Sequence, residues 1–418
     1  MIRFIVIGIT DHPQPWFPPE VEEIIRHGRV FSGGRRHHEI VASLLPPDVR
    51  WIDIAAPLDD VFDAYRALSI LAPLRSASVP AGRAVHSPLS IVVFASGDPL
   101  FFGFATTIRR RMPEAEVVVY PTLNSLQMLA HRLLMPYHDL RVTSLTGRPW
   151  DDFDRVLIER SPKIGVLTDK EHTPSAIARR MLEYGYRDYR MHVGQHLGNP
   201  GQEGVVTLSL EEAAKEAFAM PNCVILEGEP SLRCSPYGLP DATFALLDGR
   251  VKMITKMPIR LLTLQALDLP RRLTLWDVGA CTGSVSIEAR LRFPHLRIEA
   301  FEVRPECEAI IQENMRRHGA PGIGLHIGDF LAQDLDSLAR VSRPDAVFVG
   351  GHGGCLTDIM ATCVSLLAPD GLVVMNSVSE QSRQMFRTAC RELGLREDAS
   401  VRIQLDNHNP IDILRCRK

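Results

Sequence analysis

Glycines and an acidic residue stand together where an apolar, strand-like run meets a helical pattern, in the segment LWDVGACTGSVSIEA at residues 275–289. Gly279 permits a tight turn after the strand, and Gly283 lets the following helix pack close. Asp277 ends the strand, and the N–H groups of the turn and of the helix start then face a ligand. The pattern indicates a cradle for a nucleotide or a related cofactor.

Acidic residues at the ends of the next strand-like runs narrow the class of ligand. Glu302 ends the second run, where an acid accepts from the two hydroxyls of a ribose. Asp329, after Gly328, ends the third run, where an acid commonly holds the adenine amine, and Gly350 and Gly351 end the fourth. The acidic lining and the G-x-C-x-G spacing disfavour a pyrophosphate. S-adenosylmethionine has no phosphate and carries a sulfonium cation, so we predict that it is the cofactor.

The composition is that of a soluble globular protein without an excess of basic residues. The chain has 418 residues, a net charge of -3 and 45% hydrophobic residues. At about 100–200 residues per domain it holds two or three domains, and its charge does not support a nucleic-acid partner. No run approaches the ~18 apolar residues of a membrane span. The N-terminus is typical of a first strand rather than a signal peptide, so we expect a cytoplasmic protein. The cysteines form no CxxC pair, and no metal site is expected.

Strand-like runs alternate with helical patterns along the whole chain, which is typical of α/β layers with largely parallel sheets. A Pro- and Gly-rich segment at 228–244 divides them into two series, so we predict domains at 1–229 and 230–418. Five strands with crossover helices and two terminal extended segments predict a doubly wound, Rossmann-like sheet in the second. The expected strands are 2–9, 29–33, 49–55, 90–97, 115–121, 141–147, 163–169, 189–194, 205–210, 223–229, 273–279, 297–303, 325–329, 345–351, 372–378, 400–406 and 410–416.

The second domain resembles the class I S-adenosylmethionine methyltransferases, and more narrowly the decarboxylating methyltransferases of cobalamin biosynthesis. The motifs that carry the resemblance are GLPDATF at 238–244, ITKMPIR at 254–260, the cradle at 275–289 and FVGGHGG at 348–354. The cofactor contacts predicted for this domain are Thr255, Asp277, Gly279, Ala280, Cys281, Thr282, Gly283, Glu302, Gly328, Asp329 and Gly350.

The first domain resembles the tetrapyrrole methylases, and more closely the precorrin methylases. The motifs are FSGGRRH at 31–37, ASGDPLFFG at 95–103, PTLNSLQ at 121–127 and HLGNPGQE at 196–203. Gly97 allows an unusual backbone angle, and Asp98 caps the helix expected next. The resemblance implies two α/β lobes, about 1–112 and 113–229, with S-adenosylmethionine between them. The cofactor contacts that it implies are Gly8, Ser96, Gly97, Asp98, Leu100, Phe101 and Ser125.

Several positions depart from these family patterns. The first strand ends in GITDH, Gly8 to His12, where a GxGPG loop is usual, and Thr122 and Thr146 replace a usual Gly and His. In the second domain Cys281 stands where Gly is usual, and His352 where a small residue such as Ser is usual. An imidazole in that glycine turn donates to a carboxylate or moves a proton, so His352 is the predicted catalytic residue.

With both resemblances in this order, the chain is similar to the fused decarboxylating precorrin methyltransferases of the aerobic cobalamin pathway. The resemblance implies that the first domain methylates carbon 5. The second domain then methylates carbon 15 and removes the carboxyl group of the carbon 12 acetate. The implied substrate is precorrin-6B, reached from precorrin-6Y by reduction, and the product is precorrin-8X. A homo-oligomer is also implied, with a tetramer as the expected form.

A precorrin carries several carboxylate arms, which bind best to Arg, Lys, His and free N–H groups. Arg35, Arg36 and His37 form the densest group in the first domain. Lys256 and Arg260 are four residues apart and share a face if their segment begins a helix. The predicted substrate contacts are Arg35, Arg36, His37, Asp241, Lys256 and Arg260.

Two other functions are compatible with the sequence. Related class I domains methylate RNA, but an RNA substrate needs a basic stripe or an RNA-binding domain, and the first domain supplies neither. In the other alternative, the first domain is a non-catalytic module that binds the tetrapyrrole or holds an oligomer together. The GITDH loop favours that alternative and GDPLFFG at 97–103 disfavours it. The number of cofactors bound per chain distinguishes a double methylase from a single one.

Overall fold

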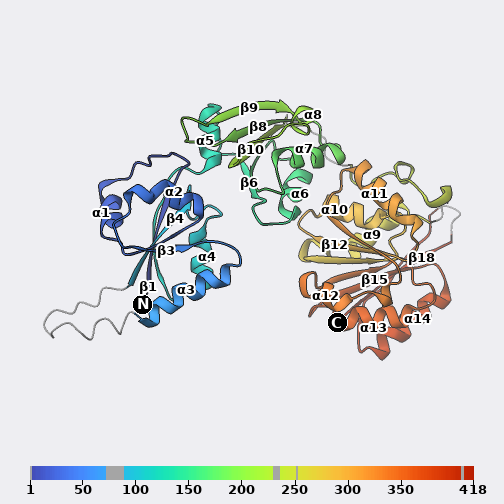
Figure 1. Cartoon of the computed structure of the whole chain (residues 1–418). Helices are drawn as coiled ribbons and strands as arrows, with labels where there is room; N and C mark the ends of the chain where they lie inside the picture. The colour runs from blue at the N-terminus through green and yellow to red at the C-terminus, as the bar shows by residue number, and fades with distance from the viewer. Residues whose placement is uncertain (1, 72–88, 229–235, 251–252, 406–408) are drawn as a thin grey trace. The chain divides into compact units, whose positions relative to one another are not determined.

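The computed structural model describes residues 2–71, 89–228, 236–250, 253–405 and 409–418, which contain three β-sheets flanked by helices (Figure 1). The chain divides into two compact units. The first unit is Met1–Gly147, Lys163–Ala178 and Arg190–Glu227, and the second is Arg148–Pro162, Arg179–Tyr189 and Gly228–Lys418. The domain boundary predicted between residues 229 and 230 lies outside the described residues. None of the described helices is long and apolar enough to cross a membrane.

The first sheet is wholly parallel, with strand order β3-β2-β4-β1-β5. Its strands are β1 (Ile2–Ile9), β2 (Val30–Gly33), β3 (Arg50–Asp53), β4 (Leu89–Ser96) and β5 (Glu116–Tyr120), and its helices are α1 (Pro19–His27), α2 (Arg35–Val41), α3 (Leu58–Leu71) and α4 (Phe104–Arg111). Phe4 and Val6 pack in a core with α3 and α4, whereas Ile5 and Ile7 pack in a core with α1 and α2. Both faces are therefore covered, which explains the nearly continuous apolar runs of the strands.

Strand β5 corrects the lobe boundary that the sequence predicts near residue 112. It pairs in parallel with β1, with Val118 opposite Ile5. The first sheet therefore runs to Tyr120, and the segment at 112–115 only connects α4 to β5. A proline-containing connection between two apolar runs marks the end of an element, and it does not by itself mark the end of a lobe.

The second sheet is mixed rather than largely parallel, with strand order β6-β7-β10-β8-β9. Its strands are β6 (Arg141–Ser144), β7 (Lys163–Leu167), β8 (Tyr189–Gln195), β9 (Gly204–Ser209) and β10 (Asn222–Gly228), and its helices are α5 (Ser125–Arg132), α6 (Asp151–Ile158), α7 (Pro174–Glu183) and α8 (Leu210–Ala213). β6 and β7 are parallel, whereas β8 and β9 form an antiparallel pair joined by the loop at 196–203. A short loop without a crossover helix reverses the chain, which makes the pair antiparallel.

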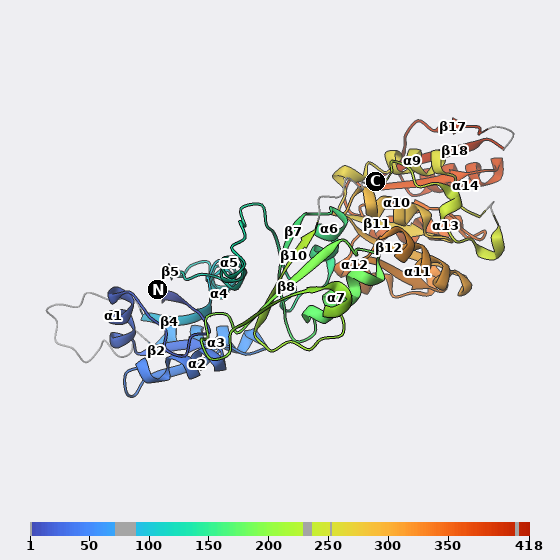
Figure 2. The ribbon, with the colours of Figure 1, turned by 90° about the horizontal axis from the view of Figure 1, so that it is seen from above.

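The third sheet has the predicted doubly wound order, β13-β12-β11-β14-β15, followed by the antiparallel strand β18. The short strands β16 and β17 both pair with β18, and β17 lies beside β18 in Figure 2. The two-residue β16 is not predicted by the sequence. The strands are β11 (Thr274–Val278), β12 (Arg297–Glu302), β13 (Ile323–Ile327), β14 (Ala346–Val349), β15 (Leu372–Ser377), β16 (Arg396–Glu397), β17 (Val401–Ile403) and β18 (Ile411–Arg417).

Helices cover both faces of the third sheet (Figure 1). One face carries α9 (Met257–Ala266), α10 (Ser284–Arg292) and α11 (Glu306–His318), and the other α12 (Leu335–Val341), α13 (Leu356–Leu366) and α14 (Glu380–Glu392). Along the chain, the sheet first grows from β11 to one side through β12 and β13, and then to the other side through β14 and β15. The strand order therefore reverses between β11 and β14. Open α/β sheets bind their ligands beyond the carboxyl ends of the strands at such a switch point.

Candidate active sites

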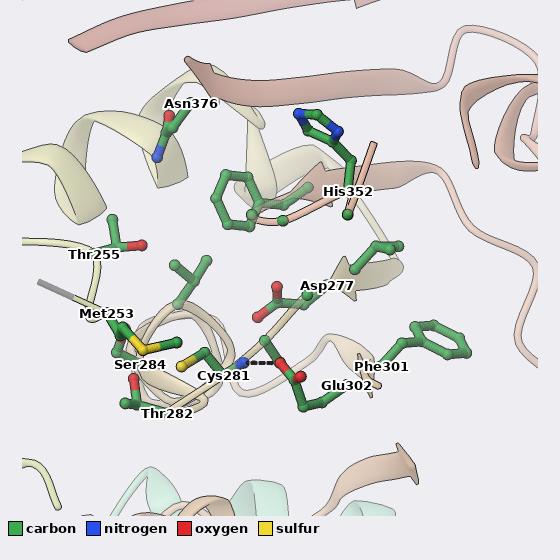
Figure 3. Close-up of a pocket in the computed structure, with 18 of the residues that line it drawn as sticks. Met253, Thr255, Asp277, Cys281, Thr282, Ser284, Phe301, Glu302, His352 and Asn376 are labelled. Carbon is green, nitrogen blue, oxygen red and sulfur yellow. Dashed lines mark hydrogen bonds between the residues drawn. The ribbon is translucent and has the colours of Figure 1, made fainter. Parts of the chain in front are cut away.

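A cavity of about 880 Å³ opens at the carboxyl ends of the parallel strands of the third sheet (Figure 3). The ends of β11, β12, β13 and β14 all contribute to its wall. Lys256 and His352 line it as well. The predicted cofactor contacts that line the cavity are Thr255, Asp277, Gly279, Ala280, Cys281, Thr282, Glu302, Gly328, Asp329 and Gly350.

Gly279 and Gly283 act differently in the turn after β11. Gly279 has a φ of +82°, and a Cβ there would lie 2.6 Å from the backbone N of Gly351, so the turns after β11 and β14 meet at this glycine. Gly283 does not line the cavity. It precedes α10, and a Cβ there would lie 2.9 Å from Cγ2 of Ile311 on α11. The structure therefore does not support the predicted cofactor contact at Gly283. It does support the predicted role of Gly283 in close helix packing.

Cys281 adopts the left-handed backbone region, with a φ of +52°, which favours glycine. The conformation fits the glycine that the resemblance to the methyltransferases leads us to expect at this position. The Cys281 side chain is buried in the core of the domain, close to Cys307 and Arg304, and burial raises its pKa. Its backbone N–H donates to Oε2 of Glu302 at 2.7 Å (Figure 3).

Glu302 ends β12 and is almost fully buried, and Arg304 holds both of its carboxylate oxygens. Nε and the backbone N of Arg304 donate to Oε1 at 2.7 and 3.0 Å, and Nη2 donates to Oε2 at 3.0 Å. Burial opposes ionisation, but the hydrogen bonds from Arg304 and from Cys281 outweigh it and lower the pKa of Glu302. The carboxylate predicted to bind a ribose is therefore ionised, and it already accepts four hydrogen bonds.

Asp277 is the buried acid on β11, and one of its oxygens is unsatisfied. Oδ2 accepts from the Ser286 hydroxyl at 2.6 Å, whereas Oδ1 has no hydrogen-bond partner among the described residues. Burial raises the pKa of Asp277 from 3.8 to about 6, and the nearby Glu302 adds to the shift. A buried carboxylate oxygen without a partner, in the wall of a cavity, suits a ligand that donates hydrogen bonds or carries positive charge.

His352 follows β14 in the glycine turn and is half-buried. The backbone N–H of Gly354 donates to Nδ1 at 3.2 Å, so the ring proton lies on Nε2, which donates to the Ser382 hydroxyl at 3.3 Å. Burial lowers the pKa of His352 below its usual value of 6.5. The side chain is therefore neutral near pH 7, and a catalytic role for it stays a prediction.

The predicted substrate contacts Asp241, Lys256 and Arg260 form one ion-pair cluster, but they differ in accessibility. Lys256 precedes α9, and its Nζ lies 3.8 Å from Oδ2 of Asp241. The Arg260 side chain is fully buried and donates to Oδ1 of Asp241 at 3.2 Å, to Glu288 at 3.2 Å and to the carbonyl of Leu239. Arg260 therefore anchors the 238–244 turn, and the prediction that it contacts substrate is not supported.

The carboxyl edge of the first sheet brings together most of the cofactor contacts predicted for the first unit. Gly8 at the end of β1 has no room for a side chain, because a Cβ would collide with the carbonyl of Gly97 and lie 2.8 Å from the N of Thr122. Gly97 has a φ of +60° and packs on Asn124, which precedes Ser125 and α5. The turns after β1 and β4 and the start of α5 therefore meet at one place.

Asp98, Leu100 and Phe101 form the turn after β4. Oδ1 of Asp98 accepts from the backbone N of Leu100 at 2.8 Å. The helix α4 begins only at Phe104, with Gly103 as its N-cap, so the prediction that Asp98 caps this helix is wrong. Leu100 is half-exposed, and Phe101 packs against the core around α5. The turn is longer than predicted because the side chain of Asp98 closes it before the helix starts.

Arg36 and His37 meet Ser96 at the same edge, together with two residues that the sequence reasoning missed, Asp11 and His196. Nη2 of Arg36 donates to Oγ of Ser96 at 2.8 Å, and Nε2 of His37 lies 2.9 Å from the same oxygen. Burial and the charge of Arg36 lower the pKa of His37 to about 4. His37 is therefore neutral near pH 7.

Arg35 is exposed and pairs with Glu39, outside this cluster. The signal that finds Asp11 is an acid at the end of a parallel strand or within two residues beyond it, the same signal that singled out Glu302 and Asp329. No comparable signal exists for His196, because its partner is distant in the sequence.

The fold and the two edge sites define the class of protein. The third sheet, with its acid-lined cavity, forms a Rossmann-like methyltransferase domain, and the two sheets of the first unit form the lobes of a tetrapyrrole methylase. Residues 7–214 match the family described as Tetrapyrrole (Corrin/Porphyrin) Methylases, and residues 247–416 match the Precorrin methyltransferase domain.

Known proteins match the chain over both domains. The crystal structure of a precorrin-6Y C5,15-methyltransferase from Geobacter metallireducens is 31% identical and covers 43% of this chain and 97% of its own, with a TM-score of 0.39. A cobalt-precorrin-6B C(15)-methyltransferase (decarboxylating) from Salmonella typhimurium is 32% identical over 41% of this chain and 93% of that protein. A precorrin-6Y C(5,15)-methyltransferase (decarboxylating) from Sinorhizobium sp is 30% identical over 97% of this chain and 91% of that protein. The chain belongs to the family of these decarboxylating precorrin-6Y C(5,15)-methyltransferases of cobalamin biosynthesis.

Proposed function

We propose that the chain binds S-adenosylmethionine in each of its two domains and methylates precorrin-6B at carbons 5 and 15. It also removes the carboxyl group of the carbon 12 acetate, which gives precorrin-8X. The observation that carries the proposal is the acid-lined cavity of the third sheet, in whose wall Oδ1 of Asp277 lacks a partner in the described part of the chain. Membership of the family, matched over both domains, supports the two methylations.

The residues of the cavity fit S-adenosylmethionine. When bound, this cofactor supplies a methyl group that its sulfonium activates. Its cationic groups suit the carboxylates of Asp277, Glu302 and Asp329, which all line the cavity. The volume of about 880 Å³ lies within the range of roughly 300–1,000 Å³ that is common for ligand pockets.

The protein contributes alignment and exclusion of water to the methyl transfer. Lys256, in the cavity wall, binds a carboxylate arm of the precorrin, and Nε2–H of His352 orients another. During decarboxylation the bond to the carboxyl carbon breaks, its electron pair enters the conjugated macrocycle, carbon dioxide leaves and the methylene carbon takes up a proton from solvent. Because burial keeps His352 neutral, the departing carboxylate is oriented without the stabilisation of a full ion pair.

We assign methylation at carbon 5 to the first unit and methylation at carbon 15 with decarboxylation to the second. The Salmonella relative supports the division, because its printed name gives only the carbon 15 methylation and the decarboxylation, and it covers 41% of this chain. The matched families support it too, since a precorrin methyltransferase domain stands in the second half and a tetrapyrrole methylase in the first.

Isothermal titration calorimetry of the full chain with S-adenosylmethionine tests the proposal. We expect two equivalents in the wild type, and one each in Gly279→Val and Gly97→Val, because both glycines have a positive φ and lack room for a side chain. Circular dichroism checks that both variants fold. One equivalent in the wild type, lost in Gly279→Val, would leave the first unit as a non-catalytic module and would contradict methylation by it.

The proposed homo-oligomer, with a tetramer as the expected form, and the proposed cytoplasmic location rest on the family resemblance. Light scattering of the purified chain tests the first, and fractionation of cells that express it tests the second.

A further inference from the structure

The edge site of the first unit contains a carboxylate–imidazole pair that the proposed function does not yet use. Asp11 follows β1, and His196 follows β8. Oδ2 of Asp11 lies 2.9 Å from Nδ1 of His196, and both side chains are largely buried, with 10% and 19% of their surface exposed. The two residues are far apart in the sequence, so the pair joins the first sheet to the loop at 196–203 within the first unit.

The hydrogen bonds of the pair fix which ring nitrogen carries the proton. An ionised carboxylate only accepts hydrogen bonds, so the proton of His196 lies on Nδ1, toward Asp11. Nε2 is then an acceptor with a lone pair, and no hydrogen bond to it is formed by the part of the chain that the structure describes. A carboxylate that orients an imidazole in this way is the arrangement that makes histidine an effective general base.

The carboxylate of Asp11 is itself held in place from the other side. Its Oδ1 accepts from Nη1 of Arg36 at 2.7 Å, and Nη2 of the same side chain donates to Ser96. Arg36 thus holds Asp11 with one hydrogen bond and is itself held by a second one to Ser96, the last residue of β4. This geometry gives Arg36 a positioning role besides the substrate contact that the sequence predicts.

The backbone of His196, the residue that pairs with Asp11, is strained. Its φ of +45° lies in the left-handed region, which is uncommon for a residue other than glycine. The backbone N–H donates to the carbonyl of Pro221 at 2.9 Å, and the side chain is fixed by Asp11. Residues held in such regions by their surroundings cluster at active sites.

We propose that His196 is the general base of the first unit and that Asp11 is its positioning residue. The inference rests on the proposed function, in which this unit methylates carbon 5. In that step a bond forms between carbon 5 and the methyl group, and the electron pair of the methyl–sulfur bond stays with sulfur. The electron pair of the C–H bond returns to the conjugated ring, and the proton moves to Nε2 of His196. The GITDH loop is then a functional feature, because it supplies the carboxylate of Asp11.

The matched variant His196→Asn separates a base from a structural clamp. The amide N–H of asparagine can still donate to Asp11, and asparagine tolerates a positive φ, but it offers no basic lone pair. We measure carbon 5 methylation of precorrin-6B in the full chain by mass spectrometry and nuclear magnetic resonance. We expect kcat for this step to fall about 10²–10⁴-fold, with unchanged binding of S-adenosylmethionine. His12→Asn, in the same loop, is the control and retains the wild-type rate.

Chemical rescue gives the second readout. In His196→Ala, free imidazole restores carbon 5 methylation if the side chain acts as a base, whereas a merely structural role is not restored. Asp11→Asn lowers kcat and leaves KM unchanged, because the imidazole loses the partner that fixes its proton on Nδ1. Wild-type rates in His196→Asn, or a loss in His196→Ala that imidazole does not restore, would overturn the assignment of the base. If the wild type itself leaves carbon 5 unmethylated, the proposed function of the first unit fails. If the wild type methylates carbon 5 and the variants give either of the two overturning results, only the assignment of His196 as the base fails.

Discussion

Arg304 occupies both oxygens of Glu302, the residue that the sequence predicts as the ribose acceptor. Three of the four hydrogen bonds to this carboxylate come from Arg304, at 2.7, 3.0 and 3.0 Å, and the fourth comes from the N–H of Cys281. A carboxylate has about four acceptor positions, so all of them are taken. A ribose therefore binds Glu302 only if the guanidinium of Arg304 moves away.

We expect Arg304→Ala to strengthen the binding of S-adenosylmethionine in the second unit. The Arg304 side chain is one-third exposed, so breaking its ion pair costs about 1 kcal/mol, which corresponds to about a five-fold change in Kd. Calorimetry measures the change. Arg297→Ala, at the opposite end of β12, is the control and leaves the affinity unchanged. Weaker binding in Arg304→Ala would instead mean that Arg304 supports the bound cofactor.

Arg260 and Lys256 are expected to affect different properties although both contact Asp241. Arg260→Ala leaves the buried Glu288 with only the more distant Arg292 as an ion-pair partner, and breaking a buried pair in this way costs about 3–5 kcal/mol of the free energy of unfolding. Lys256→Ala removes a partly exposed side chain from the cavity wall, so it raises KM for the precorrin and leaves stability almost unchanged. Urea unfolding and steady-state kinetics of both variants check this contrast. A stable Arg260→Ala variant with a raised KM would restore Arg260 as a substrate contact.

The sequence predicts the strands and the residues at their ends, because buried parallel strands are apolar along their length and carry their ligand residues just beyond. Asp277, Glu302 and Asp329 were found in this way, and all line one cavity. Side-chain pairing is less predictable, since spacing does not tell which partner a charged group chooses. Arg260 turns inward to Glu288, and Arg304 turns back to Glu302. The pair of Asp11 and His196 depends on how distant loops meet, which no local pattern encodes.

Asp277 is expected to make the second unit less stable as the pH rises from about 4 to 6. Burial raises its pKa from 3.8 to about 6, so in this range the unfolded chain releases a proton that the folded chain retains. The stability present below pH 3.8 is lost as the pH rises through 6, by about 3 kcal/mol at about 1.4 kcal/mol per pH unit. Urea unfolding at pH 4, 5 and 7 measures this slope, the decrease of the free energy of unfolding with rising pH.

Asp277→Asn tests the same group. An amide does not ionise, so this contribution to the slope disappears and the free energy of unfolding at pH 7 rises. The affinity for S-adenosylmethionine falls, because the cavity loses the anionic oxygen Oδ1. Ser286→Ala removes the hydrogen bond to Oδ2, which in the wild type lowers the pKa of Asp277, and leaves the carboxyl group in place, so the loss of stability with pH persists and extends to higher pH. A slope that persists unchanged in Asp277→Asn would assign it to another group.

His37 is expected to have the opposite effect in the first unit. Burial and the charge of Arg36 lower its pKa from 6.5 to about 4, so between these values the unfolded chain binds a proton that the folded chain does not. The stability is therefore complete above pH 6.5 and is lost as the pH falls toward 4, by about 3 kcal/mol. His37→Gln retains an amide N–H for Ser96 and does not titrate. The stability of the first unit therefore loses this contribution to its pH dependence. Scanning calorimetry of the full chain at pH 5 and 7 measures Tm for the wild type and for His37→Gln. If Tm falls equally in both proteins between pH 7 and pH 5, His37 is not the group responsible.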